Sequence, residues 1–195
     1  MPRPLGRKRC HATHETILEA THALLLEVGF EKLTIEGVAA RAGVGKATIY
    51  RWWTSKGELA VEAFLHAISV TLAFPVTESA RADIAEQHQR VARAYRGKTG
   101  RIVREIIGTA QFDPATSKLF FEGYLKPRRA AAREALLRGI AQKEFRPDID
   151  LEAVIDALYA PIFHRLLLGH AKNDAAFLRF TSDLVLDGIA AVPGS

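Results

Sequence analysis

The chain has 195 residues, of which 48% are hydrophobic and 25% are charged, an ordinary globular composition. This supply of apolar side chains excludes a disordered chain, and the single cysteine excludes an intrachain disulfide and a four-cysteine zinc site. No apolar stretch is long enough to span a bilayer, and the basic start is not followed by the apolar core of a signal peptide. We therefore expect a cytoplasmic protein with no membrane partner.

The formal net charge of +5 is unevenly distributed along the chain. Residues 1–56 carry nine Lys or Arg against five Asp or Glu, whereas residues 57–195 carry 18 against 17. A basic segment of this kind is typical of a part that meets a polyanion such as nucleic acid. A solvated basic tail is the alternative interpretation.

Apolar residues recur at helical spacing along nearly the whole chain. Helices are predicted over about residues 11–28, 35–42, 45–52, 56–75, 79–95, 99–111, 114–123, 126–144, 150–169 and 174–190. Thr34 and Asp150 are suited to cap the helices that follow them, and Gly43 is suited to end the second helix. Because no segment alternates with period two and no internal repeat occurs, the predicted fold class is all-α.

Residues 34–53 contain two short predicted helices separated by a tight turn with glycine, the arrangement of a helix-turn-helix. In such a motif the second helix places its N-terminus in the DNA major groove, which requires small residues and hydrogen-bond donors there. Gly45, Lys46 and Thr48 meet that requirement. The sequence therefore predicts a DNA-binding module in the basic first third of the chain.

Several spaced segments extend this pattern: Gly29-Phe30, Leu33-Thr34-Ile35, the run from Val38 to Trp53, and the run from Ser55 to Leu59. Over about residues 12–60 the chain resembles the DNA-binding domain of the tetracycline-repressor (TetR/AcrR) family. The resemblance implies an N-terminal three-helix helix-turn-helix domain followed by a C-terminal helical bundle that dimerises. We accordingly expect a basic flexible arm over residues 1–10, a DNA-binding domain over 11–56 and a ligand-sensing and dimerisation domain over 57–195.

The resemblance, together with exposure expected from the pattern, implies a set of DNA-contacting residues. They are Thr34, Arg41, Gly45, Lys46, Thr48, Tyr50, Arg51, Trp52 and Lys56. Trp53 departs from the phenylalanine usual in the family, but it keeps an aromatic ring and is expected in the core. The basic arm either enters a neighbouring minor groove or serves as a solubilising tail.

The family typically holds a small-molecule effector in the larger domain, and aromatic residues are frequent there. The candidate ligand-binding residues are Phe112, Phe120, Tyr124, Tyr159, Phe163 and His164. Pro161 is expected to bend its helix and open space beside Tyr159 and Phe163. Since most of these residues are apolar, we expect a hydrophobic or aromatic effector and no metal or cofactor. Packing in the core or in the dimer interface is the alternative role for most of the aromatics.

The sequence therefore favours a transcriptional regulator, specifically a repressor that binds a near-palindromic operator as a homodimer and is released by its effector. One alternative is a DNA-binding protein without ligand response. An enzyme is disfavoured because no set of nucleophile, base or metal ligands is present. The phosphate-loop-like runs ending in Gly45-Lys46 and Gly97-Lys98-Thr99 each lack a required residue and a preceding strand.

Overall fold

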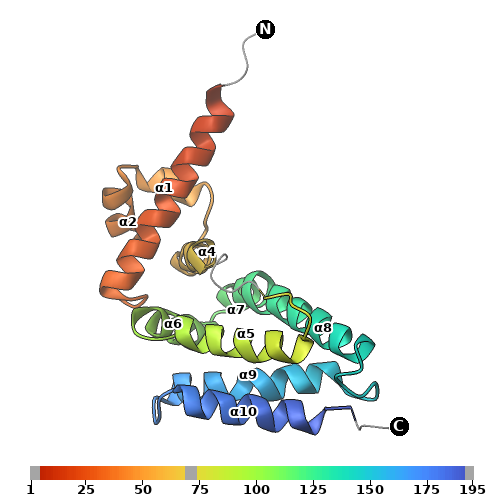
Figure 1. Cartoon of the computed structure of the whole chain (residues 1–195). Helices are drawn as coiled ribbons and strands as arrows, with labels where there is room; N and C mark the ends of the chain where they lie inside the picture. Colours follow the sequence, from red (N-terminus) through yellow and green to blue (C-terminus); the bar gives the residue numbers. More distant parts are fainter. Residues whose placement is uncertain (1–4, 69–73, 192–195) are drawn as a thin grey trace. The chain divides into compact units, whose positions relative to one another are not determined.

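The computed structural model describes residues 5–68 and 74–191, except for the side chains of residues 5–10 (Figure 1). Its elements are α1 (Leu5–Val28), α2 (Ile35–Ala42), α3 (Lys46–Tyr50), α4 (Lys56–Ile68), α5 (Ala80–Ala94), α6 (Lys98–Ala110), α7 (Pro114–Phe120), the π-helical turn η1 (Phe121–Leu125), α8 (Lys126–Ala141), α9 (Leu151–Leu168) and α10 (Ala175–Gly188). Within these residues no strand forms, and none of the helices is long and apolar enough to cross a membrane. The predicted all-α fold class is confirmed.

The predicted helix caps are present. The Thr34 hydroxyl accepts a hydrogen bond from the Gly37 backbone N–H at 3.0 Å, which satisfies one of the free donors at the start of α2. Gly43 ends α2 with a φ of 66°, a left-handed conformation that favours glycine. The Asp150 carboxylate accepts from the backbone N–H groups of Glu152 and Ala153 and so begins α9.

Helix α1 begins earlier than the sequence predicted. It starts at Leu5 instead of about His11, so the predicted flexible arm is helical from residue 5 onward. Arg7, Lys8 and Arg9 are strong helix formers, and extending an existing helix by one residue is easier than starting a new one. The remaining part of the arm, residues 1–4, lies outside the described residues.

The chain packs as two compact units, which differ from the predicted domains. Unit 1 comprises Met1–Ser69 with Arg101–Tyr124, and unit 2 comprises Val70–Gly100 with Leu125–Ser195. The predicted boundary at residues 56–57 therefore falls inside unit 1. The reason is that α4 buries Leu59 and Phe64 completely and packs on both α1 and α7.

In unit 1 the end of α1 is held by side chains from α6. The Phe30 backbone N–H donates to Glu105 at 2.6 Å, and the Arg101 guanidinium donates to the carbonyls of Leu25 and Leu26. The Leu26 carbonyl is in the last turn of α1, where a helix leaves its carbonyls without intrahelical partners, and Arg101 supplies a donor there. The C-terminal end of α1 is thereby tied to α6.

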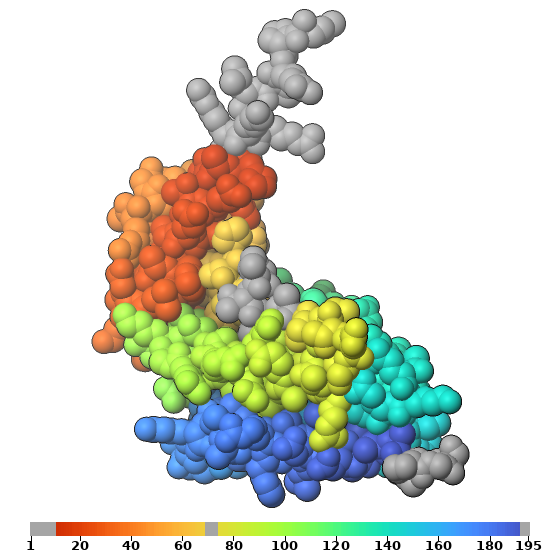
Figure 2. Space-filling view, in the orientation of Figure 1, coloured from red at the N-terminus to blue at the C-terminus, as the bar shows by residue number. Residues whose placement is uncertain are grey.

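In unit 2 helices α5, α8, α9 and α10 enclose a second core. Its buried side chains include Leu136, Phe145, Leu158 and Leu186. Gly139 of α8 allows the Phe145 ring to approach, since a Cβ there would lie 2.3 Å from the ring. The space-filling view shows α5 and α10 directly against each other (Figure 2), as their contacts require. Pro161 lies inside α9, which nevertheless remains one helix.

Candidate DNA-binding surface

Helices α2 and α3 form the predicted helix-turn-helix. Helix α2 buries Ile35, Val38 and Ala39 against the rest of unit 1, whereas α3 buries only Ile49. One apolar anchor thus fixes the five-residue helix α3 and leaves its other side chains outside the core. This is the arrangement that a helix needs in order to enter a DNA groove.

The N-terminus of α3 faces solvent. Gly45 is the N-cap residue and is exposed, as is Lys46, while Thr48 is half-buried. At the other end of the helix Tyr50 is 54% exposed and Arg51 is exposed. The five residues predicted to contact DNA here therefore occupy one short segment with accessible donors.

Two of the candidate cations are paired with carboxylates in the absence of DNA. Lys46 Nζ lies 2.9 Å from Glu36 Oε1, and Arg41 Nη1 lies 2.7 Å from Glu27 Oε2. The hydrogen bond between Lys46 and Glu36 raises the pKa of the lysine and lowers the pKa of the glutamate. Both pairs are exposed and hence weak, so a phosphate or a base edge can compete for each cation.

Lys56 has a structural role that the sequence did not predict. Its ammonium group donates to the carbonyl oxygens of Phe30 and Glu31, each at 3.2 Å, and lies 4.8 Å from the centre of the Phe30 ring. An ammonium group has three N–H donors, so one remains for a DNA phosphate. Thr34 is similarly occupied as the cap of α2, and its side chain is exposed.

An aromatic cluster behind α3 was only partly predicted. Trp53 is 2% exposed, as expected for a core residue, and its indole N–H donates to Glu62 at 2.6 Å. The His14 ring stacks on Trp53 at 4.8 Å and its Nε2 lies 3.1 Å from the same glutamate. Trp52 is half-buried and meets both rings edge-on. His14 and Glu62 were missed because these contacts join α1, α4 and the loop after α3 and have no periodic sequence signal.

The candidate ligand-binding residues are divided between the two units. In unit 1, Phe112 is 92% exposed, whereas Phe120 and Tyr124 are buried and stack on each other at 4.9 Å. In unit 2, Tyr159 and Phe163 are half-buried and His164 is exposed. Helical periodicity of aromatics does not distinguish a packed core from a cavity wall, which explains why the sequence grouped them.

His164 lines an open depression of 660 Å³ on unit 2. Its wall is formed by residues of α9 and α10, including Ala157, Pro161 and Phe177. Tyr159 and Phe163 instead pack against α5, with ring distances of 5.9 Å to His88 and 5.7 Å to Tyr95. The wall of this depression therefore includes His164 but neither Tyr159 nor Phe163.

Comparison with known proteins gives the family. The model of the bacterial regulatory proteins of the tetR family matches residues 17–63, and the model of the tetracyclin repressor-like C-terminal domain matches residues 74–185. The chain belongs to the TetR family of transcriptional regulators. The matched N-terminal segment contains the helix-turn-helix described above, so the protein is a DNA-binding regulator.

Individual TetR-family proteins support this assignment over nearly the full chain. The HTH-type transcriptional regulator YdeS of Bacillus subtilis is 37% identical over 188 residues, which cover 96% of this chain and 93% of YdeS. The DNA-binding transcriptional repressor TetR of Mycobacteroides abscessus is 26% identical over 87% of this chain and 90% of its own. The crystal structure of the TetR family transcription regulator SCO0332 has a TM-score of 0.80 at 38% identity, covering 91% of this chain and 98% of that one.

Proposed function

We propose that this TetR-family regulator is a repressor that binds a near-palindromic operator as a homodimer and is released by a small-molecule effector. The observation that carries the proposal is the exposed N-terminus of α3, with Lys46 accessible and Ile49 as the anchor. The repressor role is supported by the similar protein of Mycobacteroides abscessus, which is named a repressor. Its place of action is the cytoplasm, where bacterial DNA lies.

The proposed DNA contacts follow from the placement of each side chain. Lys46 and Thr48 at the start of α3 reach base edges, while Tyr50 and Trp52 donate to phosphates through their polar tips. The remaining proposed phosphate contacts are Thr34, Arg41, Gly45, Arg51 and Lys56. On DNA binding, Arg41 and Lys46 leave their carboxylate partners, Glu27 and Glu36, and pair with DNA instead. Their contribution to the affinity for DNA is therefore sensitive to salt.

The proposed dimer uses α9 and α10. Both helices carry large apolar side chains that the protomer does not bury: Leu168 is 66% exposed, Phe180 68% and Leu184 66%. A stripe of this kind over two packed helices is typical of an interaction site. A two-fold axis through it joins like surfaces and places two copies of α3 on the same DNA.

We assign a separate function to each compact unit. Unit 1 binds the operator, and unit 2 dimerises and holds the effector. An effector releases DNA only if it binds the released conformation more tightly than the DNA-bound one. A DNA-binding protein without ligand response remains the second candidate, and operator affinity that no small molecule alters distinguishes it. We assign the chain no catalytic role, in line with the regulators of its family.

Selection of bound sequences from a genomic DNA pool tests the proposal. We expect enrichment of a near-palindrome whose half-sites lie one helical turn apart, about 34–36 Å, or a multiple of that distance. Affinity for the enriched site should fall steeply with salt, as phosphate contacts require. Failure to enrich any sequence, or enrichment of a single asymmetric half-site, would contradict a dimeric operator-binding protein.

A further inference from the structure

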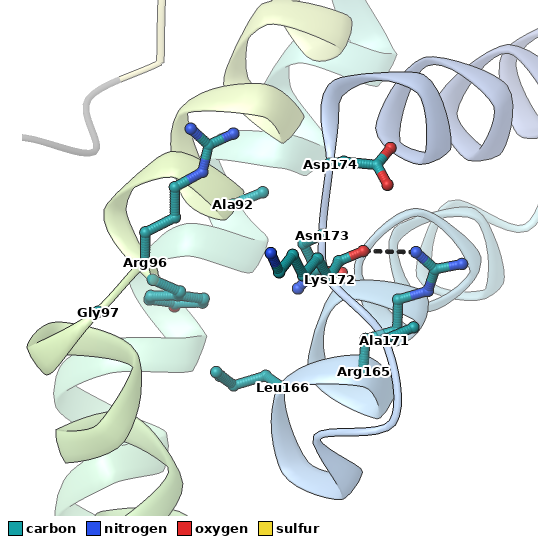
Figure 3. A pocket seen from close by; sticks show the side chains of 10 residues that line it. Ala92, Arg96, Gly97, Arg165, Leu166, Ala171, Lys172, Asn173 and Asp174 are labelled. Carbon is teal, nitrogen blue, oxygen red and sulfur yellow. Dashed lines mark hydrogen bonds between the residues drawn. The ribbon is translucent and has the colours of Figure 1, made fainter.

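A pocket of 480 Å³ lies in unit 2 between the C-terminal end of α5 and the connection from α9 to α10 (Figure 3). Its apolar wall is formed by Ala92, Leu166 and Ala171 together with Tyr95, which is 5% exposed. None of its lining residues belongs to the helix-turn-helix or to the proposed ligand-binding aromatics. The pocket is therefore a separate feature of the molecule.

The lining is positively charged. Arg96, Arg165 and Lys172 contribute three cations, and Asp174 contributes the one carboxylate. Asp174 is already engaged as the cap of α10, where it accepts from the Phe177 backbone N–H at 2.9 Å. The net charge of the lining residues therefore favours an anion.

The three cations differ in how they are held. Arg165 is fixed, since it donates to the Lys172 carbonyl at 2.5 Å, as drawn in Figure 3, and its guanidinium lies 3.2 Å from the centre of the Phe177 ring. Arg96 and Lys172 make no side-chain ion pair or hydrogen bond with any part of the chain that the structure describes. Their charges are available to a ligand.

A helix start adds to the positive potential. Gly97, which lines the pocket, has a φ of 63° and is followed directly by the first residue of α6, Lys98. The first backbone N–H groups of a helix lack intrahelical partners and carry the positive end of its dipole. An anion near Gly97 thus gains from α6 as well as from the two free cations.

Two buried polar atoms of the lining residues have no hydrogen-bond partner among the described residues: Tyr95 Oη and Asn173 Oδ1. The Asn173 amide is oriented by its Nδ2 group, which donates to the Ile162 carbonyl at 3.1 Å. Its Oδ1 atom is consequently an acceptor without a donor. Buried polar groups are normally paired, so these atoms call for a ligand or water that pairs them.

We propose that this pocket binds a small organic acid. Its carboxylate pairs with Arg96 and Lys172, and its apolar body lies against Leu166 and the Tyr95 ring. A hydroxyl or amino group donates to Asn173 Oδ1 and also hydrogen-bonds with the Tyr95 hydroxyl. Aromatic hydroxy acids combine these three features at a size that the volume accommodates. Ligand binding here stands on its own, whereas a role for the acid as the effector rests on the proposed function.

A route from this pocket to the DNA-binding unit exists within the chain. The turn at Gly97 leads directly into α6, and α6 carries Arg101 and Glu105, which hold the end of α1. An acid that changes the conformation of this turn would therefore act on the helix whose far residues hold α1. This connection is the route by which the acid acts as an effector.

Isothermal titration calorimetry on the full-length protein tests the site. The ligands are 4-hydroxybenzoate, 4-hydroxyphenylacetate and the uncharged 4-hydroxybenzyl alcohol. We expect at least one acid to bind and the alcohol to bind about tenfold more weakly, because it lacks the charge-assisted hydrogen bonds. Arg96→Gln and Lys172→Gln should each weaken the acid about fivefold or more, while the control Lys143→Gln, on the turn after α8, leaves it unchanged. The proposal is overturned if neither acid binds at millimolar concentration. It is also overturned if the variant that carries both Arg96→Gln and Lys172→Gln binds the acid as tightly as the wild type.

Tyr95→Phe gives a second readout that does not need a tight ligand. It removes the unpaired hydroxyl but keeps the ring, so the free protein should keep or raise its Tm, whereas acid binding weakens. A lowered Tm would show that the hydroxyl is paired within the protein and would contradict this part of the site. Operator affinity measured with and without the acid then tests the effector role separately: binding without a change in operator affinity keeps the site and overturns the role.

Discussion

Trp53 shows how a single residue joins three parts of unit 1. Its ring is buried under His14, and its indole N–H donates to Glu62 of α4, which also lies 3.1 Å from His14 Nε2. The family's usual phenylalanine would keep the apolar ring but would lose the hydrogen bond. This chain therefore uses a polar contact to connect α1, α4 and the end of the helix-turn-helix.

Trp53→Phe should lower the free energy of unfolding by about 2 kcal/mol, since a hydrogen bond to a charged group is lost and ring volume is removed. Urea denaturation measures the change. Trp52→Phe is the matched control because Trp52 is half-buried, and it should cost under about 0.5 kcal/mol. Equal effects of the two substitutions would show that the contact with Glu62 does not stabilise unit 1.

His88 makes the stability of unit 2 depend on pH. Burial lowers its pKa, partly offset by its hydrogen bond to the Leu158 carbonyl at 2.7 Å. Below about pH 6.5 the unfolded chain therefore binds a proton that the folded chain does not, so stability is complete at neutral pH and falls on acidification. The pKa of His22, in unit 1, is lowered in the same way, mainly by burial, so the stability of unit 1 has the same pH dependence.

Urea denaturation at a series of pH values from about 7.5 to about 5 should show the unfolding free energy falling by up to about 1.4 kcal/mol per pH unit for each such histidine. His88→Gln should reduce this slope by up to about 1.4 kcal/mol per pH unit, because one fewer proton is taken up on unfolding. Direct titration of the His88 ring by NMR provides the second measurement, and a ring that protonates above pH 6.5 would contradict this sign.

At the scale of helices, the sequence predicts the contacts that cap a helix end from nearby residues but not those made by residues distant in the chain. Thr34, Gly43 and Asp150 act within four residues of their own positions, and the sequence predicted each of them. Glu105, which holds the end of α1, and Glu144, which holds the start of α5, act on residues more than 60 positions away. No local pattern identifies such partners, because the tertiary fold brings them together.

The π-helical turn Phe121–Leu125 was missed for a related reason. The sequence predicted separate helices over 114–123 and 126–144, whereas α7, η1 and α8 follow one another without a break. Pro127 lies in the first turn of α8, where its missing N–H leaves no hydrogen bond unmade. The extra residue of a π turn changes which side chains face the core, and periodicity at 3.6 residues does not anticipate it.

Glu144 provides the test at this scale. It accepts from the backbone N–H groups of Ala80 and Arg81 and from the Ser79 hydroxyl; burial alone would raise its pKa, but these bonds lower it below the usual value. Glu144→Gln replaces one acceptor oxygen by a donor and removes the charge at the start of α5. We expect a loss of about 2 kcal/mol in urea denaturation.

The matched control is Glu134→Gln, which removes the same charge from an exposed position of α8 and should have little effect. In the wild type, the stabilisation from Glu144 should be present above about pH 4.5 and be lost as the pH falls through its lowered pKa. Equal stability of the two variants at neutral pH would contradict the capping role of Glu144.

At the scale of the molecule, the resemblance in the first third of the chain correctly predicted the family and the helix-turn-helix. It did not predict that residues 101–124 join the N-terminal helices in unit 1. That arrangement depends on α7 packing against α4, where Gly57 lies so close to Thr116 that a Cβ would be 2.2 Å from its hydroxyl. A close approach of this kind between distant segments has no signal in hydrophobic periodicity.

The proposed dimer can be tested by introducing charged side chains on the exposed apolar face of α10. Leu184→Glu and Phe180→Glu place carboxylates among apolar side chains and should convert a micromolar dimer into a folded monomer. Sedimentation velocity measures the state, and Leu137→Glu, on the exposed face of α8, is the control that should leave the dimer intact. A wild-type monomer at micromolar concentration would contradict the proposed assembly.

DNA binding by α3 is tested most directly by fluorescence anisotropy with the selected operator and folded variants of α3. Lys46→Ala should weaken binding by about 1–3 kcal/mol and relax specificity at one base position, and Tyr50→Phe should weaken binding to all sequences alike. Lys143→Ala, in unit 2, should bind as the wild type does. Operator affinity unchanged in both α3 variants, with their folds intact by circular dichroism, would contradict the claim that the exposed face of α3 binds DNA.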